Sequence, residues 1–254
     1  MLKRLFAIGA TVVAMAATPA MAKEWDKVRI GVEGAYPPFS QTNPDGSVTG
    51  FDIDIANALC AAMNAECTMV KQDWDGIIPA LLARKYDAII ASMSITEERK
   101  QKVDFTDKYY TSPLAYAAKK GAAIDLANLK GKTVGVQRST IADTYISNAV
   151  EGANVKRYGT QDEAYLDMKA GRLDLLLADV FVLTDGFLSK EGGDAYELTG
   201  DSITDAKWVG EGIGIAVRKK DQDLTQQLNA AIAKIRADGT YDKIRKKYFE
   251  FEIY

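Results

Sequence analysis

The chain has 254 residues, of which 47% are hydrophobic and 26% charged, a balance typical of a soluble globular protein with one large or two medium-sized cores. This composition excludes a disordered chain, a collagen and a coiled coil. The sequence contains no histidine, so catalytic triads that use histidine and the usual histidine-containing zinc sites are excluded too. We expect neither a metal nor another cofactor.

The first 22 residues have the pattern of a secretory signal that is cleaved after export. Lys3 and Arg4 precede an uncharged apolar run over residues 5–17, and small residues at 20 and 22 precede the cleavage point. The run is shorter than the roughly 20 apolar residues that span a membrane. The remaining 232 residues carry 30 Lys and Arg against 35 Asp and Glu. This acidic balance argues against binding to nucleic acid or to anionic membranes.

The two cysteines, Cys60 and Cys67, both lie in the exported part. A single helix would hold their Cα atoms roughly 10 Å apart, which is beyond the reach of a disulfide. A helix that ends near Asn64 and is followed by an extended segment would bring them together. The alternative is a pair of free structural thiols.

Strands and helices alternate through the first part of the chain. We predict strands at residues 28–32, 67–70 and 87–91, with helices at 52–63 and 74–83 between them. This order predicts a parallel sheet covered by helices, in which ligands bind at the carboxyl ends of the strands.

The same pattern restarts further along. Strands are predicted at 133–136, 155–158 and 174–178, with helices at 140–150 and 161–170. Residues 81–90 also resemble residues 168–177 in pattern. Two similar α/β lobes would explain the match, and convergence of two helix-turn-strand units is the alternative.

The elements predicted after residue 178 are too few to form a third lobe. A helix at 180–189 and a polar stretch at 191–204 precede a strand at 212–217 and helices at 222–237 and 241–249. We expect this part to pack back on the first lobe, so that the chain crosses between the lobes twice. Two crossings form a hinge, and the cleft beside it suits a small ligand.

Candidate binding residues follow the predicted strands of the first lobe. Glu33 and Tyr36 come directly after the first strand, where Tyr36 would offer a ring and Glu33 an acceptor. Trp74 stands in a polar context and would form a second aromatic wall. The alternatives are a stiff proline-rich turn around Tyr36 and a surface tryptophan beside a helix cap at Asp73.

An arginine near a helix start suggests an anion site. Ser94 and Glu97 have capping-box spacing, which predicts a helix start with free amides. Arg99 is unfavourable near the positive end of a helix unless a bound carboxylate is held there. A surface ion pair with Glu98 or Asp104 is the alternative.

The second lobe offers matching groups. Ser139 and Thr140 open a helix and could donate to an anion from the opposite side of the cleft, or could serve only as caps. Asp179 ends an apolar strand and could take an ammonium group, or could cap the next helix.

Together these motifs resemble the periplasmic solute-binding proteins of ABC importers for polar amino acids, particularly the lysine/arginine/ornithine- and histidine-binding group. The resemblance covers nearly all of the exported part and includes GFDIDI at 50–55, SMSIT at 92–96, GRLD at 171–174 and DGTY at 238–241. The spacing of Cys60 and Cys67 also matches the single disulfide of that group.

The resemblance implies a monomeric, two-lobed periplasmic receptor of the type II fold that delivers one amino acid to an inner-membrane permease. Lobe 1 would comprise residues 23–112 and 207–254, and lobe 2 residues 113–206, with hinge segments near 111–114 and 204–211. Each lobe would contain a mostly parallel sheet flanked by helices. No catalysis is implied.

The resemblance also implies a role for each candidate residue. Arg99 would bind the α-carboxylate with Ser94 and the turn at Thr140, and Asp179 with Ser92 would bind the α-ammonium group. The side chain would lie between Tyr36 and Trp74, and Glu33, with Asp52, would meet its distal cationic group. The candidate set is completed by Met93 and Ser139.

Some positions depart from the family pattern. Members often have aspartate at Glu33, phenylalanine at Trp74 and serine at Ala91, and the turn at 137–140 lacks the commoner Gly-Ser/Thr-Thr sequence. Opine receptors also resemble this scaffold, so an octopine- or nopaline-type ligand is an alternative. A further alternative is an enzyme similar to the cyclohexadienyl or arogenate dehydratases, in which Asp179 or Glu33 would be the acid.

Overall fold

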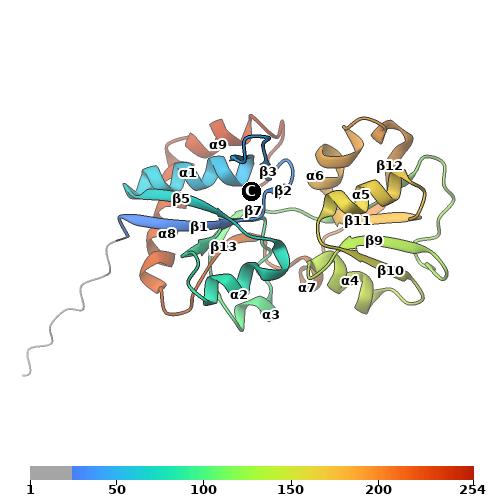
Figure 1. The fold of residues 1–254 in the computed structure, drawn as a ribbon, viewed down its shortest axis with the longest axis horizontal. Helices are drawn as coiled ribbons and strands as arrows, with labels where there is room; N and C mark the ends of the chain where they lie inside the picture. The colour runs from blue at the N-terminus through green and yellow to red at the C-terminus, as the bar shows by residue number, and fades with distance from the viewer. Residues whose placement is uncertain (1–24) are drawn as a thin grey trace, which may run out of the picture.

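The computed structural model describes residues 25–254, which form two α/β lobes side by side (Figure 1). Each lobe is built on a five-stranded sheet. The strands of the first sheet, in spatial order, are β5 (Glu66–Lys71), β1 (Lys27–Val32), β6 (Ala88–Ile89), β13 (Ile213–Val217) and β7 (Asp104–Tyr110). Those of the second are β10 (Asn154–Tyr158), β9 (Thr133–Gln137), β11 (Leu175–Asp179), β8 (Leu114–Lys119) and β12 (Tyr196–Ile203).

In each sheet, the strands that were predicted to be parallel pair in parallel and make up about half of the sheet. β1 pairs in parallel with β5 and β6, and β9 pairs in parallel with β10 and β11. The other half is antiparallel, because β13 runs against β6 and β7 while β8 runs against β11 and β12. The sequence did not indicate β7, β8 or β12. β12 lies in the polar stretch, and its side chains are exposed or half-buried because it is an edge strand.

Helices flank both sheets (Figure 1). The first lobe has α1 (Phe51–Met63), α2 (Ile77–Leu82), α3 (Glu97–Lys100), α8 (Gln222–Ala237) and α9 (Thr240–Arg245). The second has α4 (Ile141–Ala149), α5 (Gln161–Lys169) and α6 (Val180–Leu183), and α7 (Ala206–Val209) lies against α4. The helix predicted at 74–83 begins as a 3-10 turn, η1 (Trp74–Gly76), and the one predicted at 180–189 continues after α6 as a π-helical turn, η2 (Thr184–Leu188).

Short elements complete the chain. The strands β2 (Ala35–Tyr36), β3 (Ser40–Thr42) and β4 (Val48–Thr49) form a small antiparallel sheet after β1. A 3-10 turn, η3 (Gly193–Ala195), leads into β12. The small sheet places Tyr36 close to the carboxyl end of β1.

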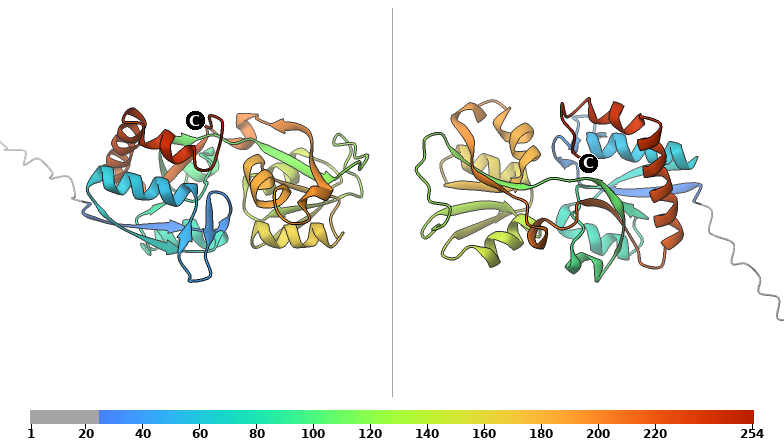
Figure 2. Two further views of the ribbon diagram at one scale, coloured as in Figure 1. Left: turned by 90° about the horizontal axis from the view of Figure 1, so that it is seen from above. Right: turned by 180° about the vertical axis from the view of Figure 1, so that it is seen from behind.

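The chain crosses between the lobes twice, as the order of elements predicted. β7 of the first sheet ends at Tyr110 and β8 of the second begins at Leu114, and the return runs from Ile203 to Ile213. Figure 2 shows the two connecting segments passing between the lobes. The helix α8 packs against α1 and β7, so the C-terminal part does return to the first lobe.

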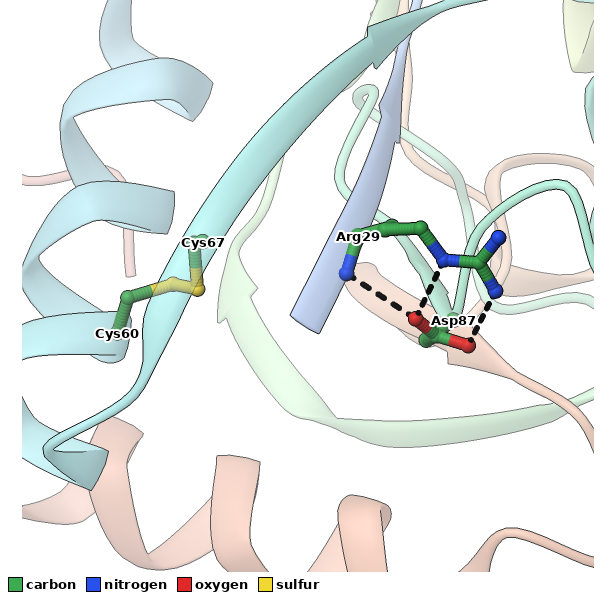
Figure 3. Close-up of a disulfide and its surroundings, with 4 residues drawn as sticks. All are labelled: Arg29, Cys60, Cys67 and Asp87. Carbon is green, nitrogen blue, oxygen red and sulfur yellow. Dashed lines mark hydrogen bonds and ion pairs between the residues drawn. A yellow bond between two sulfur atoms is a disulfide. The ribbon is translucent and has the colours of Figure 1, made fainter. Parts of the chain in front are cut away.

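The repeated sequence pattern corresponds to one repeated structure. In both lobes a helix ends in a left-handed residue, Arg84 (φ 62°) or Gly171 (φ 72°), and a short turn leads to an aspartate before the next strand. The Asp87 carboxylate accepts from the backbone N–H of Arg29 at 3.1 Å, and that of Asp174 from Thr133 at 2.8 Å. Each aspartate therefore ties its strand to the neighbouring parallel strand, and Figure 3 shows the bonds of Asp87.

The cysteines form the predicted disulfide. The helix α1 ends at Asn64, whose left-handed conformation (φ 56°) turns the chain back into β5. This turn brings the Cα atoms of Cys60 and Cys67 to 6.1 Å, and their sulfur atoms are bonded (Figure 3). The disulfide joins α1 to the edge strand β5.

The predicted secretory signal lies outside the described residues. Within residues 25–254, no helix is long and apolar enough to cross a membrane.

Candidate ligand-binding site

A cavity lies between the lobes, at the carboxyl ends of strands β1, β9 and β11. Its empty volume is about 500 Å³, including the opening to solvent. Eight of the eleven predicted ligand-binding residues line it, together with groups that the sequence did not single out. The lining consists of Glu33, Tyr36, Trp74, Ala91, Ser92, Ser94, Arg99, Ser112, Leu114, Gln137, Thr140, Ile141, Ala142, Gln161, Ala178, Asp179 and Ile213.

Arg99 brings a guanidinium group to this cavity without a carboxylate partner. No carboxylate in the described part of the chain forms an ion pair with it. Its nitrogens donate instead to the carbonyl oxygens of Ser94 at 3.0 Å and Ser139 at 3.4 Å, and its ring neighbour is Trp74 at 5.2 Å. Burial lowers the pKa of Arg99 to about 10. A half-buried cation whose hydrogen-bond partners are neutral carbonyl oxygens is suited to an anionic group of a ligand.

The helix start beside Arg99 differs from the prediction. Thr96 caps α3, because its hydroxyl accepts from the backbone N–H of Arg99 at 3.3 Å. Ser94 does not cap the helix, since its backbone is paired with Ile213 of β13 and its carbonyl holds the Arg99 side chain. Ser94 still lines the cavity, as predicted.

The two aromatic walls are both present. Tyr36 lines the cavity from β2, and burial raises the pKa of its hydroxyl, as do the carboxylates of Asp179 and Glu33. Trp74 stands in a polar sequence context, yet its side chain is only 8% exposed because it packs with the apolar side chains of α2. Its indole N–H donates to the Ser139 carbonyl of the other lobe at 3.1 Å.

Asp179 caps a helix and also lines the cavity. Its Oδ1 accepts from the backbone N–H groups of Phe181 at 2.8 Å and Val182 at 3.4 Å, so it caps α6. It also lines the cavity. Burial raises the pKa of Asp179 to about 6, although the Ser112 hydroxyl and these amides oppose the rise. The carboxylate is therefore largely ionised at neutral pH and faces the cavity as an anion.

Thr140 and Ser139 differ in their place relative to the cavity. Thr140 caps α4 by accepting from the Asp143 backbone N–H at 3.2 Å, and it lines the cavity. Ser139 does not line the cavity and contributes only its carbonyl oxygen to Trp74 and Arg99.

Glu33 lies at another part of the lining, at the end of β1. It is 7% exposed, and its Oε1 accepts from Gln137 Nε2 at 2.5 Å. Burial raises the pKa of Glu33 to about 7, the hydrogen bond from Gln137 lowers it, and the carboxylates of Asp162, Asp73 and Asp75 raise it further. These carboxylates make the surroundings of Glu33 favourable for a cation.

Two further candidates are behind the cavity wall. Asp52 is completely buried, with Oδ2 accepting from the Ser92 backbone N–H at 2.7 Å and hydroxyl at 2.9 Å, and Oδ1 accepting from the Tyr109 hydroxyl at 2.8 Å. Asp52 was predicted to meet a distal cation, but it does not line the cavity and instead positions Ser92. Met93 is also fully buried and belongs to the core around α2.

Contacts across the cavity join the two lobes. Glu33 of the first lobe meets Gln137 of the second, and Trp74 meets Ser139. Outside the cavity, Arg138 forms an ion pair with Asp75. The structure is thus a closed arrangement, in which the lining residues of both lobes surround one space.

Three polar lining residues were not predicted, namely Gln137, Gln161 and Ser112. Gln137 ends β9 as Glu33 ends β1, so its place at a strand end could have identified it. Gln161 opens α5 directly after the capping residue Thr160. A helix start is common for a polar residue, so this position carried no separate signal.

Comparison with known proteins identifies the family. The model of the bacterial extracellular solute-binding proteins, family 3, matches residues 28–251. The chain belongs to this family. The resemblance predicted from the sequence is therefore confirmed.

Curated relatives of the family cover almost the whole chain. The chain is 49% identical to the L-arginine-binding protein of Pseudomonas aeruginosa over 257 aligned residues, which cover 100% of this chain and 99% of the relative. It is 42% identical to the lysine/arginine/ornithine-binding periplasmic protein of Escherichia coli, over 90% of each chain.

The solved structures agree with this assignment. A Salmonella typhimurium periplasmic binding protein, described for its high arginine specificity, superimposes with a TM-score of 0.82 at 34% identity, covering 88% of this chain and 99% of that one. The agreement confirms the predicted two-lobed, type II fold.

Proposed function

We propose that this family 3 protein is a periplasmic receptor that binds one cationic amino acid, of the arginine, lysine, ornithine or histidine type, and delivers it to an ABC importer. The charges in the cavity carry this proposal. They comprise one guanidinium, from Arg99, and two carboxylates, from Asp179 and Glu33. A cationic amino acid has the complementary set, with one carboxylate and two cationic groups. The similarity to arginine- and lysine-binding relatives supports the same ligand class.

Each charged group has a proposed partner on the ligand. Arg99, with Ser94 and Thr140, binds the α-carboxylate in a charge-assisted contact. Asp179, with Ser92, binds the α-ammonium group.

The side chain of the ligand lies between Tyr36 and Trp74, and its distal cation meets Glu33. Asp52 supports the site by holding Ser92, through the bonds described above. Charge pairing at both ends of the ligand is sufficient for capture, and the proposed function requires no catalysis.

The two connecting segments act as the hinge in this proposal, near residues 111–114 and 204–211. Residues 23–112 and 207–254 would then move as lobe 1 and residues 113–206 as lobe 2. The cross-cavity bonds of Gln137 and Ser139 would break on opening. We further propose that residues 1–22 direct export and are cleaved, and that the receptor is monomeric and meets an inner-membrane permease.

A thermal-shift screen of the refolded, ligand-stripped protein tests the function. The screen contains the twenty amino acids, ornithine, octopine and nopaline. A ligand at a hundred times its dissociation constant adds about 2.7 kcal/mol of stability. We expect shifts with the cationic amino acids. In this screen, shifts only with octopine or nopaline would assign an opine receptor. In a separate activity assay, turnover of arogenate or prephenate would assign a dehydratase. Either result would overturn the proposal.

A further inference from the structure

Gln161 is a lining residue whose amide is incompletely used. The residue is 1% exposed, yet its Nε2 has no hydrogen-bond partner among residues 25–254. Burial raises the pKa of the Tyr165 hydroxyl well above its ordinary value, and the Gln161 amide beside it opposes this rise. The Tyr165 hydroxyl donates to the Val182 carbonyl at 3.0 Å. A buried N–H without an acceptor is costly, so this group is suited to an acceptor on a ligand.

Gln137 and Glu33 offer hydrogen-bond acceptors at the cavity lining. Both N–H groups of Gln137 are engaged, with Glu33 Oε1 at 2.5 Å and the Gly159 carbonyl at 3.1 Å. Its carbonyl oxygen and the second oxygen of Glu33 are acceptors for ligand N–H groups. Gln137 and Glu33 therefore contribute two acceptors to the lining, and Gln161 contributes a donor.

A guanidinium group can use only the acceptors, because it has no acceptor of its own. A ureido group has the same planar shape, but it combines N–H donors with a carbonyl oxygen. The carbonyl could accept from Gln161 while the N–H groups meet Gln137 and Glu33. A half-turn of the Gln161 amide would present its oxygen instead, which suits a guanidinium.

We propose that Gln161 widens the ligand range of this receptor to neutral amino acids whose side chain ends in a ureido group. This inference rests on the proposed function, since the α-carboxylate and α-ammonium contacts are the same. The ionisation of Glu33 agrees with it. Its pKa of about 7 lets the carboxyl take up a proton at little cost when no cation is bound.

Arginine and citrulline provide the test, because they differ only in the guanidinium and ureido ends. We would measure both affinities by calorimetry for the wild type and for Gln161→Leu, Gln161→Glu and a control, Gln226→Leu, which removes an exposed glutamine of α8. In the wild type we expect measurable citrulline binding. In Gln161→Leu, citrulline affinity should fall by about tenfold or more and arginine affinity by less than about threefold, since only the ureido oxygen loses its donor.

Gln161→Glu keeps the size of the side chain and removes the donor. We expect it to weaken citrulline binding and to preserve or strengthen arginine binding, and the control should match the wild type. If the wild type binds arginine but not citrulline, or if each Gln161 variant weakens both ligands equally, the inference is wrong and the proposed function stands. If the wild type binds neither arginine nor any other cationic amino acid, the proposed function itself fails.

Discussion

Replacing Glu33 by glutamine should remove the preference for a cationic side chain while keeping the shape of the site. The amide is isosteric with the carboxylate and retains an oxygen that can accept from Gln137. At pH 8.5 the variant loses a hydrogen bond to an ion, which corresponds to about 1.5–3 kcal/mol, or roughly 10- to 150-fold in arginine affinity. Affinity for glutamine, where it is measurable, should change by less than about threefold, because a neutral side chain gains little from the charge.

The pH dependence gives a second, independent measure. The pKa values of Glu33 and Asp179 are raised to about 7 and about 6, so both carboxylates are ionised above pH 7 and become protonated as the pH falls. A cationic amino acid needs both anions. Between pH 8.5 and pH 5.5 the wild type should therefore lose about a hundredfold in arginine affinity, and Glu33→Gln only about fourfold, which is the share of Asp179.

Calorimetry at the two pH values, with exposed Asp201→Asn as the control, measures both effects. The assignment of Glu33 to the distal cation would be refuted by equal losses for arginine and glutamine. It would also be refuted if Glu33→Gln kept the hundredfold pH dependence.

Three further variants test other parts of the proposed function and of the fold. Arg99→Ala should weaken ligand binding by about 2–5 kcal/mol, because the ligand carboxylate would be buried without its paired charge, and unchanged affinity would refute the contact. Asp52→Asn should lower the free energy of unfolding by about 1–3 kcal/mol and also weaken binding, since an amide cannot accept all three hydrogen bonds that it receives from Ser92 and Tyr109; urea unfolding at an unchanged midpoint would contradict this. Replacing both disulfide cysteines by alanine should cost about 2–3 kcal/mol of stability without changing arginine affinity, and a large loss of affinity would show that the disulfide shapes the cavity.

Local periodicity predicted much of the fold. Each βαβ unit could be predicted from the apolar pattern of its strand and the amphipathic pattern of its helix. The helix-turn-strand match between the lobes corresponds to one repeated structure, which Asp87 and Asp174 anchor. In the antiparallel half of each sheet, β13 was predicted as a strand, but β7, β8 and β12 were not. β12 has the polar composition of a loop, and its pairing with β8 depends on residues about 80 positions away, which local patterns do not record.

The lining residues that lie at strand ends could be predicted from the sequence. Glu33 and Thr140 come shortly after strands and Asp179 ends one, and the topology of a parallel sheet brings such positions to one edge. The burial and the hydrogen-bond partners of a side chain could not be predicted in the same way. Asp52 occupies the first turn of α1, where an acidic residue is usually exposed, and only Tyr109 and Ser92, which approach from remote segments, make it a buried acceptor.

Gln161 shows the same limit. A polar residue at the start of a helix is ordinary, and its position in the sequence does not indicate that it lines the cavity between the lobes. Contacts that depend on how two lobes meet leave no periodic trace in the sequence.

The most direct test of the account is a calorimetric titration of L-arginine into the ligand-stripped mature protein at pH 8.5. The account predicts a single site with one arginine bound per chain, together with much weaker binding of agmatine, which lacks the carboxylate that Arg99 is proposed to hold. No measurable binding of arginine, lysine, ornithine or histidine would contradict it, as would equal affinities for arginine and agmatine.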